Sequence, residues 1–141
     1  MPKRSRASLV VCARWAAVVL CLASSTAHAQ AQWMLNGLPV CVIPGCSGRL
    51  PRICGDGAGG ALIAWNRDPT VTDNNIYVHR VRSGGMLDPV WPPKGTPATR
   101  APTDQYLYDI APDGQGGAFI VWYDFPSYDI YAQHVLTNGT I

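Results

Sequence analysis

The sequence contains no glutamate, and Lys94 is the only lysine after residue 29. Glu and Lys are among the best helix formers, and no stretch after residue 29 keeps the 3.6-residue hydrophobic period of an amphipathic helix. Turn-forming Asp, Gly, Pro, Asn and Thr are abundant instead, together with the strand formers Val, Ile, Tyr and Trp. Because this apolar content also argues against disorder, the sequence predicts an all-β fold.

Long hydrophobic runs are absent as well, since spanning a bilayer takes about 20 apolar residues. The longest run, Trp15–Ala23, follows a basic N-terminus (Lys3 to Arg6) and precedes Ala27-His28-Ala29. This order is typical of a signal peptide, so we expect residues 1–29 to be removed by cleavage after Ala29. An N-terminal membrane anchor is the alternative. The mature chain would be secreted, periplasmic or on the cell surface, with no membrane span left.

An excess of basic charge is also missing from the mature chain. Four of the eleven Lys and Arg lie within residues 1–29, which leaves seven against nine Asp and a formal charge of −2. No cluster of basic residues remains along the sequence. Nucleic acid is therefore not an expected partner.

Cysteines are few, and the expected mature chain contains only Cys41, Cys46 and Cys54. An exported protein meets an oxidising compartment, so these three residues are the disulfide candidates, and their odd number allows at most one bridge among them. A zinc site is the less favoured alternative, because the nearest further ligand, His79, belongs to another predicted strand. We expect no metal and no cofactor.

The sequence does contain an internal repeat. Three segments recur: Trp33–Pro39 as Trp91–Pro97, Asp56–Trp65 as Asp113–Trp122, and Ile76–Val81 as Ile130–Val135. The offsets are 58, 57 and 54 residues, so the length changes only in the connecting loops. A period of this size with several short strands per copy predicts stacked β-units.

Each copy is predicted to form a unit of four short antiparallel strands. The expected strands are 52–54, 61–65, 76–81 and a run from Met86 towards Trp91, with 109–111, 118–122 and 130–135 in the second copy. A glycine-rich turn, locked by its aspartate, joins the first two strands. The turn residues are Asp56, Gly57, Gly59, Gly60 and Asp113, Gly114, Gly116, Gly117. Calcium binding by these aspartates is the alternative.

The pattern Asp-Gly-x-Gly-Gly-Ala-x-x-x-Trp, followed by Asp-Ile-Tyr-Ala-Gln-x-Val and a later Trp, resembles tandem repeats of large secreted bacterial proteins. Those repeats are β-propellers related in shape to the sialidase and Asp-box type. Asp129–Val135 is the closer match, and the first copy has Asn75 in place of the Asp. The resemblance covers Trp33 to Ile141 and implies a partial β-propeller of about two units.

The resemblance implies that 33–40 is the tail of one unit, 50–97 a first repeat and 107–141 an incomplete second repeat. A propeller needs at least four blades. We therefore expect the chain to be a fragment of a longer protein, with closure by oligomerisation as the alternative. Open sheet edges would favour self-association.

No catalytic group is identified, because the sequence has no Gly-x-Ser-x-Gly turn and His79 and His134 do not occupy matching positions. Both histidines are expected to be exposed on strands. The sequence predicts a non-catalytic module for binding or scaffolding, with carbohydrate or protein at the cell surface as partner. An N-terminal fragment of a carbohydrate-active propeller enzyme is the alternative.

The loop after the second strand of each copy is the expected binding surface, because loops at one end of a repeat architecture carry recognition. Its candidate residues are Asn66, Arg67, Asp68, Asp73, Tyr123, Asp124, Phe125 and Tyr128.

Overall fold

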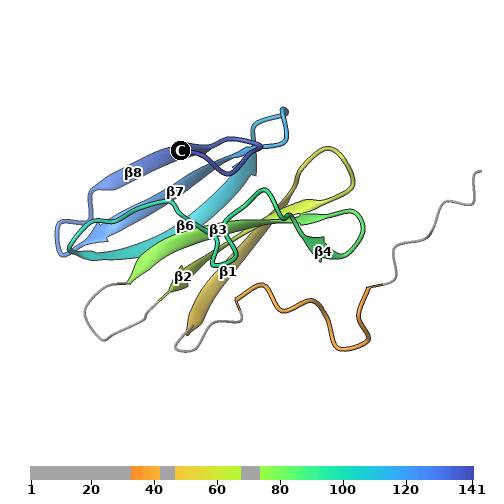
Figure 1. The fold of residues 1–141 in the computed structure, drawn as a ribbon. Helices are drawn as coiled ribbons and strands as arrows, with labels where there is room; N and C mark the ends of the chain where they lie inside the picture. Colours follow the sequence, from red (N-terminus) through yellow and green to blue (C-terminus); the bar gives the residue numbers. More distant parts are fainter. Residues whose placement is uncertain (1–32, 42–46, 68–73) are drawn as a thin grey trace, which may run out of the picture.

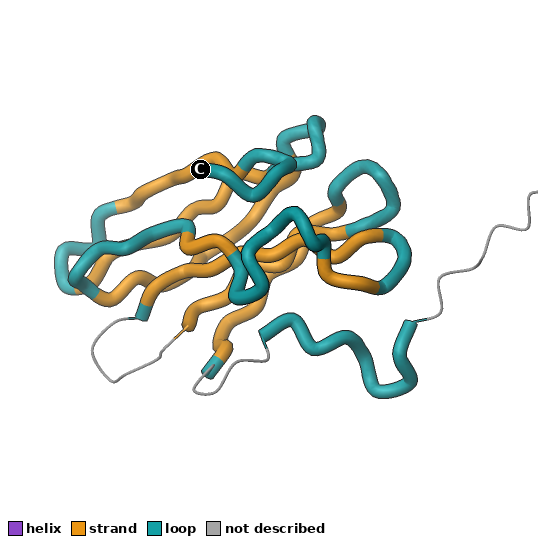
Figure 2. The backbone as a smooth tube through the Cα atoms, viewed as in Figure 1, coloured by secondary structure: helices purple, strands orange, loops and turns teal. Residues whose placement is uncertain are grey.

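The fold is built from antiparallel β-strands, which confirms the predicted all-β class (Figure 1). The computed structural model describes residues 33–41, 47–67 and 74–141, so the expected signal peptide at 1–29 lies outside the described residues. Strands and loops account for the whole described chain, and no helix occurs in it (Figure 2). Within these ranges the strands form two separate sheets and close into neither a barrel nor a propeller.

Sheet 1 holds the N-terminal strands in the spatial order β1-β2-β3-β4, and β5 also pairs with β3. Its strands are β1 (Gly48–Gly55), β2 (Ala61–Arg67), β3 (Asn75–Arg82), β4 (Met86–Leu87) and β5 (Thr96–Pro97). The register of β2 on β3 runs without a break from Ala61 opposite Val81 to Arg67 opposite Asn75. This central pair is rich in β-branched and aromatic residues, which favour the strand conformation.

Sheet 2 holds the C-terminal strands in the order β6-β7-β8. Its strands are β6 (Asp104–Pro112), β7 (Ala118–Phe125) and β8 (Ile130–Val135). The first strands of both sheets are bulged at matching points, between Arg49 and Arg52 in β1 and between Leu107 and Asp109 in β6. The extra residue of a bulge leaves its backbone groups unpaired. The Tyr108 carbonyl uses this freedom to accept a hydrogen bond from Arg52 Nε at 3.0 Å.

The predicted strand from Met86 towards Trp91 is wrong beyond Leu87. Asp88 ends β4, because its Oδ1 accepts hydrogen bonds from Arg82 at 2.7 Å and from the Val90 amide at 3.1 Å. These bonds turn the chain out of the sheet. It returns eight residues later at Thr96, where β5 pairs with β3.

The two sheets stack face to face around a single apolar cluster. Leu62, Ala64 and Val78 of sheet 1 are completely buried, and they pack with Ile120 and Trp122 of sheet 2 in that cluster. Strand β6 lies across β1, β2 and β3. The two sheets meet through faces that do not correspond in the sequence repeat. Leu62, on the face of sheet 1 that meets sheet 2, matches Phe119, but sheet 2 packs through the neighbouring residue Ile120. Neighbouring residues of a strand point to opposite faces, so the two sheets use opposite faces of the repeated unit.

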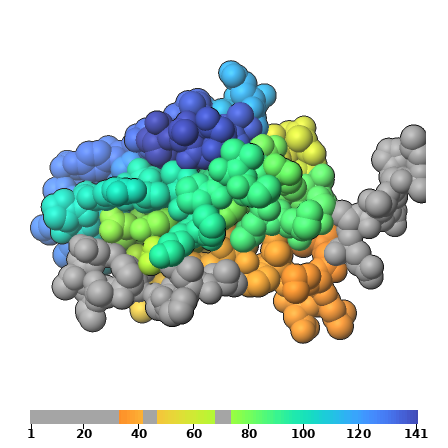
Figure 3. Space-filling model, viewed as in Figure 1, coloured from red at the N-terminus to blue at the C-terminus, as the bar shows by residue number. Residues whose placement is uncertain are grey.

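Trp91 connects the sheets at one side of this core. Its indole is 2 % exposed and donates from Nε1 to the Thr137 carbonyl at 3.1 Å. The ring lies so close to Gly139 that a Cβ there would come within 2.8 Å of it. Thr96 adds a 2.7 Å hydrogen bond to the Gly139 carbonyl. The segment near residues 80–100 accordingly lies against the C-terminal residues in the space-filling view (Figure 3).

Candidate functional site

The Asp56 carboxylate organises the turn between β1 and β2. Oδ1 accepts the backbone amides of Ala58 at 2.8 Å and Gly60 at 2.7 Å, while Oδ2 accepts Arg80 NH2 at 2.7 Å. Burial raises the pKa of Asp56, but these hydrogen bonds and the Arg80 charge outweigh it and hold the pKa below its usual value. Both carboxylate oxygens are therefore engaged with N–H donors of the protein.

Asp113 makes the same contacts in the turn between β6 and β7. Oδ1 accepts the amides of Gln115 at 2.7 Å and Gly117 at 2.9 Å, and Oδ2 lies 2.8 Å from His134 Nε2. The hydrogen bond with His134 is the main cause that lowers the pKa of Asp113. His134 thus takes the place that Arg80 has in sheet 1.

The last glycine of each turn, Gly60 or Gly117, is required because no space is left for a side chain, and not because of its backbone angles. A Cβ at Gly60 would collide with the Val81 carbonyl and lie 2.6 Å from Asp56 Oδ2. Gly117 is enclosed in the same way by the Val135 carbonyl and the Asp113 carboxylate. The two glycines before each of them have a positive φ, between 74° and 90°, that other residues rarely adopt. The turns are structural locks in both sheets.

Asn66 is not a surface binding residue, which corrects the expectation from the sequence. The residue is fully buried, with Nδ2 donating to the Gln105 carbonyl at 2.5 Å and Oδ1 accepting the Leu107 amide at 2.9 Å. Asn66 therefore joins the end of β2 to β6 across the two sheets. Asp68 and Asp73, two further candidates from the same loop, lie outside the described residues.

The three aromatic candidates of the second loop do lie together. Tyr123 and Tyr128 stack with ring centroids 5.9 Å apart, and the Phe125 ring meets Tyr128 edge-on at 5.7 Å. Tyr106 of β6 extends the group by stacking on Tyr123. Phe125 and Tyr128 are exposed. These rings form an apolar end to the outer surface of sheet 2.

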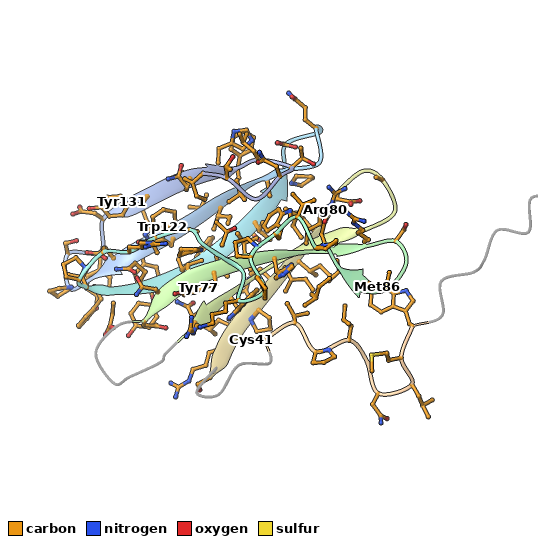
Figure 4. The ribbon with its side chains drawn as sticks, viewed as in Figure 1. Cys41, Tyr77, Arg80, Met86, Trp122 and Tyr131 are labelled. Carbon is orange, nitrogen blue, oxygen red and sulfur yellow. The ribbon has the colours of Figure 1, made fainter. Side chains whose placement is uncertain are left out.

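Asp124 points in another direction, towards the start of β6. Its Oδ1 accepts Thr103 Oγ1 at 2.6 Å and Gln105 Nε2 at 3.2 Å. Asp124 also lines a cavity of about 160 Å³ with Trp122 and Tyr131, two rings that lie side by side on sheet 2 (Figure 4). The structure therefore separates Asp124 from Arg67, which lies on sheet 1.

A pocket of about 390 Å³ on sheet 1 was not predicted from the sequence. Its lining residues are Arg67, Tyr77, Pro92, Pro93, Lys94, Gly95, Pro97 and Arg100. Three of the seven cations outside residues 1–29 meet here, and no carboxylate is among the described residues that line the pocket. No ion pair joins any of the three to another described residue. The pocket is thus a local positive site on a chain expected to be weakly acidic.

Arg67 is the fixed member of this cationic pocket. Its guanidinium carbon lies 4.8 Å from the centre of the Tyr77 ring, a distance typical of a cation–π contact. Arg67 Nε is buried and has no hydrogen-bond partner. Lys94 and Arg100 are exposed. An anionic group in the pocket would meet one held guanidinium and two solvent-exposed cations.

The pocket exists because β5 returns to sheet 1. Pro97 pairs with Tyr77 across the β3–β5 ladder, which brings the turn Pro92–Gly95 over the end of β2. Gly95 has a φ of 79°, and a Cβ there would lie 2.9 Å from both the Trp65 ring and the Val78 carbonyl. The close approach of this turn needs glycine. Arg67 is far from Lys94 and Arg100 in the sequence, and the folding of the chain around this turn brings the three side chains into one pocket.

Two of the three disulfide candidates lie within the described residues, and they differ in state. Cys41 is disulfide-bonded, whereas Cys54 is free and packs against the apolar core between the sheets. Burial, followed by the charges of Asp113, Asp109 and Asp56, raises the pKa of the Cys54 thiol. Cys46, the third candidate, lies outside the described residues.

His79 is not exposed, which corrects the expectation for this residue. The side chain is 1 % exposed and stacks on Trp91 with ring centroids 5.9 Å apart. Burial lowers the pKa of His79, although its hydrogen bond with the Arg80 carbonyl and the Asp88 charge act against this shift. The buried imidazole therefore packs against the Trp91 indole as part of the interior of the protein.

The described residues also bear on metal binding and on membrane insertion. No group of three or more His, Cys or Asp side chains is placed to hold a metal ion among them. No helix in the same ranges has the length and apolar character needed to cross a membrane.

Comparison with known proteins returned no relative. No protein-family model, no curated protein and no solved structure matches this chain.

Proposed function

We propose that this chain is an exported, non-catalytic repeat module that binds an acidic carbohydrate at the cell surface or outside the cell. The observation that carries the proposal is the pocket in which Arg67, Lys94 and Arg100 converge, with no carboxylate among its described lining residues. A sugar carboxylate is a charge-assisted acceptor for such groups. The prolines beside them offer the apolar surface on which a sugar ring can rest.

The rest of the chemistry supports binding rather than catalysis. The carboxylates with lowered pKa values are Asp56, Asp88 and Asp113, and all three hold turns through hydrogen bonds from the backbone and from basic side chains. A general acid needs the opposite shift, to a raised pKa. The carboxylates whose pKa values the fold lowers are therefore used in holding turns and strands together.

The stacking of the sheets supports a propeller-type arrangement as part of this proposal. Leu62 and Ala64 of sheet 1 face Ile120 and Trp122 of sheet 2, so opposite faces of the sequence repeat meet. Consecutive propeller blades stack in this head-to-tail manner. We infer that the two sheets are neighbouring blades and that the cationic pocket lies on the first.

Titration calorimetry with oligogalacturonate tests the ligand assignment, with a neutral oligosaccharide of equal length and oligo-aspartate as comparisons. We expect binding of the oligogalacturonate alone, with an affinity that falls as salt is added. The Arg100→Ala and Lys94→Ala variants should each weaken it by about five- to tenfold. Arg52→Ala removes a cation outside the pocket and should leave the affinity unchanged.

Three results would contradict the proposal. Binding of oligo-aspartate in place of the sugar would assign a peptide ligand, and equal affinity in the Arg100→Ala variant would place the site elsewhere. Release of new reducing ends from the oligosaccharide would show that the module is catalytic.

A further inference from the structure

We propose that this chain associates head to tail with a second copy of itself. The outer face of sheet 2, defined by Phe119, Val121, Ile130 and Ala132, would stack on the outer face of sheet 1 of the next copy, defined by Ile53 and Ile63. Residues 33–41 of that copy would pair with the free edge of β8. This association does not depend on the proposed carbohydrate ligand.

The contact between sheet 1 and sheet 2 within one chain shows what covers an apolar sheet face in this protein. In sheet 1, Leu62, Ala64, Ile76 and Val78 lie on one face, and sheet 2 buries all four completely. The hydrogen bonds of Asn66 to the β6 backbone fix the position of the two sheets. The partner of this face is thus another antiparallel sheet.

The positions of sheet 2 that match these four residues in the sequence repeat are uncovered. Phe119 and Ile130, which match Leu62 and Ile76, are 47 % and 71 % exposed. Ala132 is also exposed and Val121 is half-buried. Together with the exposed rings of Phe125 and Tyr128, they bring several exposed apolar side chains to one face, and exposed apolar patches mark interaction sites.

The complementary surface lies on the opposite side of the same chain. Ile110 and Ile120 of sheet 2 pack against sheet 1, and the residues that match them are Ile53 and Ile63. Ile53 is 67 % exposed and Ile63 is half-buried. On the outer face of sheet 1 the chain itself already buries Trp65 and Val81, so the open part of this face is the side formed by β1 and β2 with Ile53 and Ile63. One copy therefore presents counterparts of both sides of the internal interface, one on each outer face. A contact between unlike faces of this kind leads to a ring or an open series of copies.

Strand β8 pairs with no described strand on its outer side, and its register identifies what would pair with it. In sheet 1 the segment Thr96–Pro97 pairs with β3 at Val78 and Tyr77. The matching residues are Leu38–Pro39 for the segment, and Ala132 and Tyr131 for the edge. Tyr131 is 46 % exposed on β8. Edge strands with exposed apolar side chains are templates for pairing with another chain.

The segment 33–41 already has the shape that this pairing needs. The Gly37 amide bonds to the Met34 carbonyl at 2.9 Å, as the Gly95 amide bonds to the Pro92 carbonyl at 2.8 Å. The Trp33 ring lies over Gly85, where a Cβ would come within 3.1 Å of it, as Trp91 lies over Gly139. Residues 33–41 thus repeat the arrangement that delivers Thr96 and Pro97 to β3.

The segment cannot reach β8 of its own chain. Residues 33–41 and sheet 2 lie on opposite sides of sheet 1 (Figure 1). Cys41, at the end of the segment, is correspondingly distant from Tyr131 (Figure 4). A pairing of 38–39 with β8 must therefore join two copies.

The test uses two variants that each block one face. Ile130→Lys places a charge on the outer face of sheet 2, and Ile53→Lys places one on the outer face of sheet 1. Both side chains are more than half exposed, so neither change disturbs the core. Gln115→Lys adds the same charge at an exposed turn and serves as the control. The mass of the purified chain is followed by light scattering and sedimentation across a concentration series.

We expect the unmodified chain and Gln115→Lys to associate, and each blocking variant to associate at least about tenfold more weakly, because the contact would bury an unpaired charge. A mixture of the two blocking variants should form a dimer of one copy of each, since each retains the face that the other has lost. Circular dichroism verifies that both variants keep the β-fold. A monomeric unmodified chain, unchanged association of Ile130→Lys, or no dimer in the mixture would overturn the proposal.

Discussion

Arg80 in β3 and His134 in β8 occupy matching positions and bind the same oxygen of their turn aspartates. Arg80 NH2 lies 2.7 Å from Asp56 Oδ2, and His134 Nε2 lies 2.8 Å from Asp113 Oδ2. Each contact ties the first turn of a sheet to its third strand. Arg80 additionally donates from NH1 to Thr137 Oγ1 at 3.0 Å, which extends the tie from sheet 1 to the last turn of sheet 2.

The first prediction concerns the aspartate of that tie. Asp56→Ala removes the acceptor of two backbone amides and of Arg80, so we expect a loss of about 2–4 kcal/mol in the free energy of unfolding. Urea denaturation followed by tryptophan fluorescence measures it. Asp129→Ala is the matched control, since no hydrogen bond of the Asp129 side chain is present in the structure and the cost should stay within about 0.5 kcal/mol. Equal losses in the two variants would contradict the role given to Asp56.

The second prediction concerns the space at the last glycine of the turn. Gly60→Ala forces a methyl group into the Val81 carbonyl and the Asp56 carboxylate, and we expect it to cost about 2–3 kcal/mol of stability. Gly55→Ala is the control, because no atom lies within 4 Å of a Cβ at that position and its φ is not positive. Thermal unfolding should show a lower Tm for the first variant alone. A Tm equal to that of the unmodified chain would refute the steric argument.

The third prediction concerns the joint between the sheets. Asn66→Leu leaves the Gln105 carbonyl and the Leu107 amide buried without their partner, so we expect a loss of about 2–3 kcal/mol. Hydrogen exchange should quicken at Leu107, whose amide bonds to Asn66. Asn138→Leu, at an exposed turn, should leave the Leu107 amide unaffected. Unchanged exchange at Leu107 in the Asn66 variant would show that the bond contributes little.

The fourth prediction is a pH dependence that arises from His79. Burial lowers its pKa in the folded chain below the usual value of 6.5, so the unfolded chain binds this proton more readily. Stability is therefore complete above pH 6.5 and declines as the pH falls below 6.5 towards the pKa of the folded state. Denaturation at a series of pH values measures the slope, and His79→Phe should flatten it in this window. A variant with the original slope would exclude His79 as its source.

A separate loss at lower pH is expected from the aspartates, and His79→Phe should leave it in place. Asp56, Asp88 and Asp113 have pKa values below their usual 3.8 in the folded chain. For Asp88 the hydrogen bond from Arg82 is the main cause. The stability that these groups provide is present above pH 3.8 and is lost as the pH falls through their folded pKa values.

The sequence predicted the strands well where local pattern decides. The all-β class follows from the missing helix formers, and the strand at 130–135 matches β8 at both ends. The prediction from the sequence failed where the hydrogen bonds of a side chain override the local pattern. Asp88 ends β4 through bonds to Arg82 and to the Val90 amide, and such a turn cannot be read from strand propensity.

The candidate site was harder to predict, for two physical reasons. The expected loop grouped Asn66 with Arg67 because they are adjacent, yet neighbouring residues of a strand point to opposite faces. Asn66 therefore faces sheet 2, while Arg67 faces the pocket. Lys94 and Arg100 lie far along the chain from Arg67, and the pairing of β5 with β3 alone brings them together.

The position of Trp91 has a consequence for how this chain can change over evolution. The loop between the second and third strands is three residues shorter in the second copy, as the offsets of 57 and 54 show, so this connection accepts insertions. The bend from Asp88 to Gly95 is equally irregular but carries the indole that lies on Gly139. A residue added there would retract that ring and tilt one sheet against the other. This loop should therefore be conserved in length although it lies outside the strands.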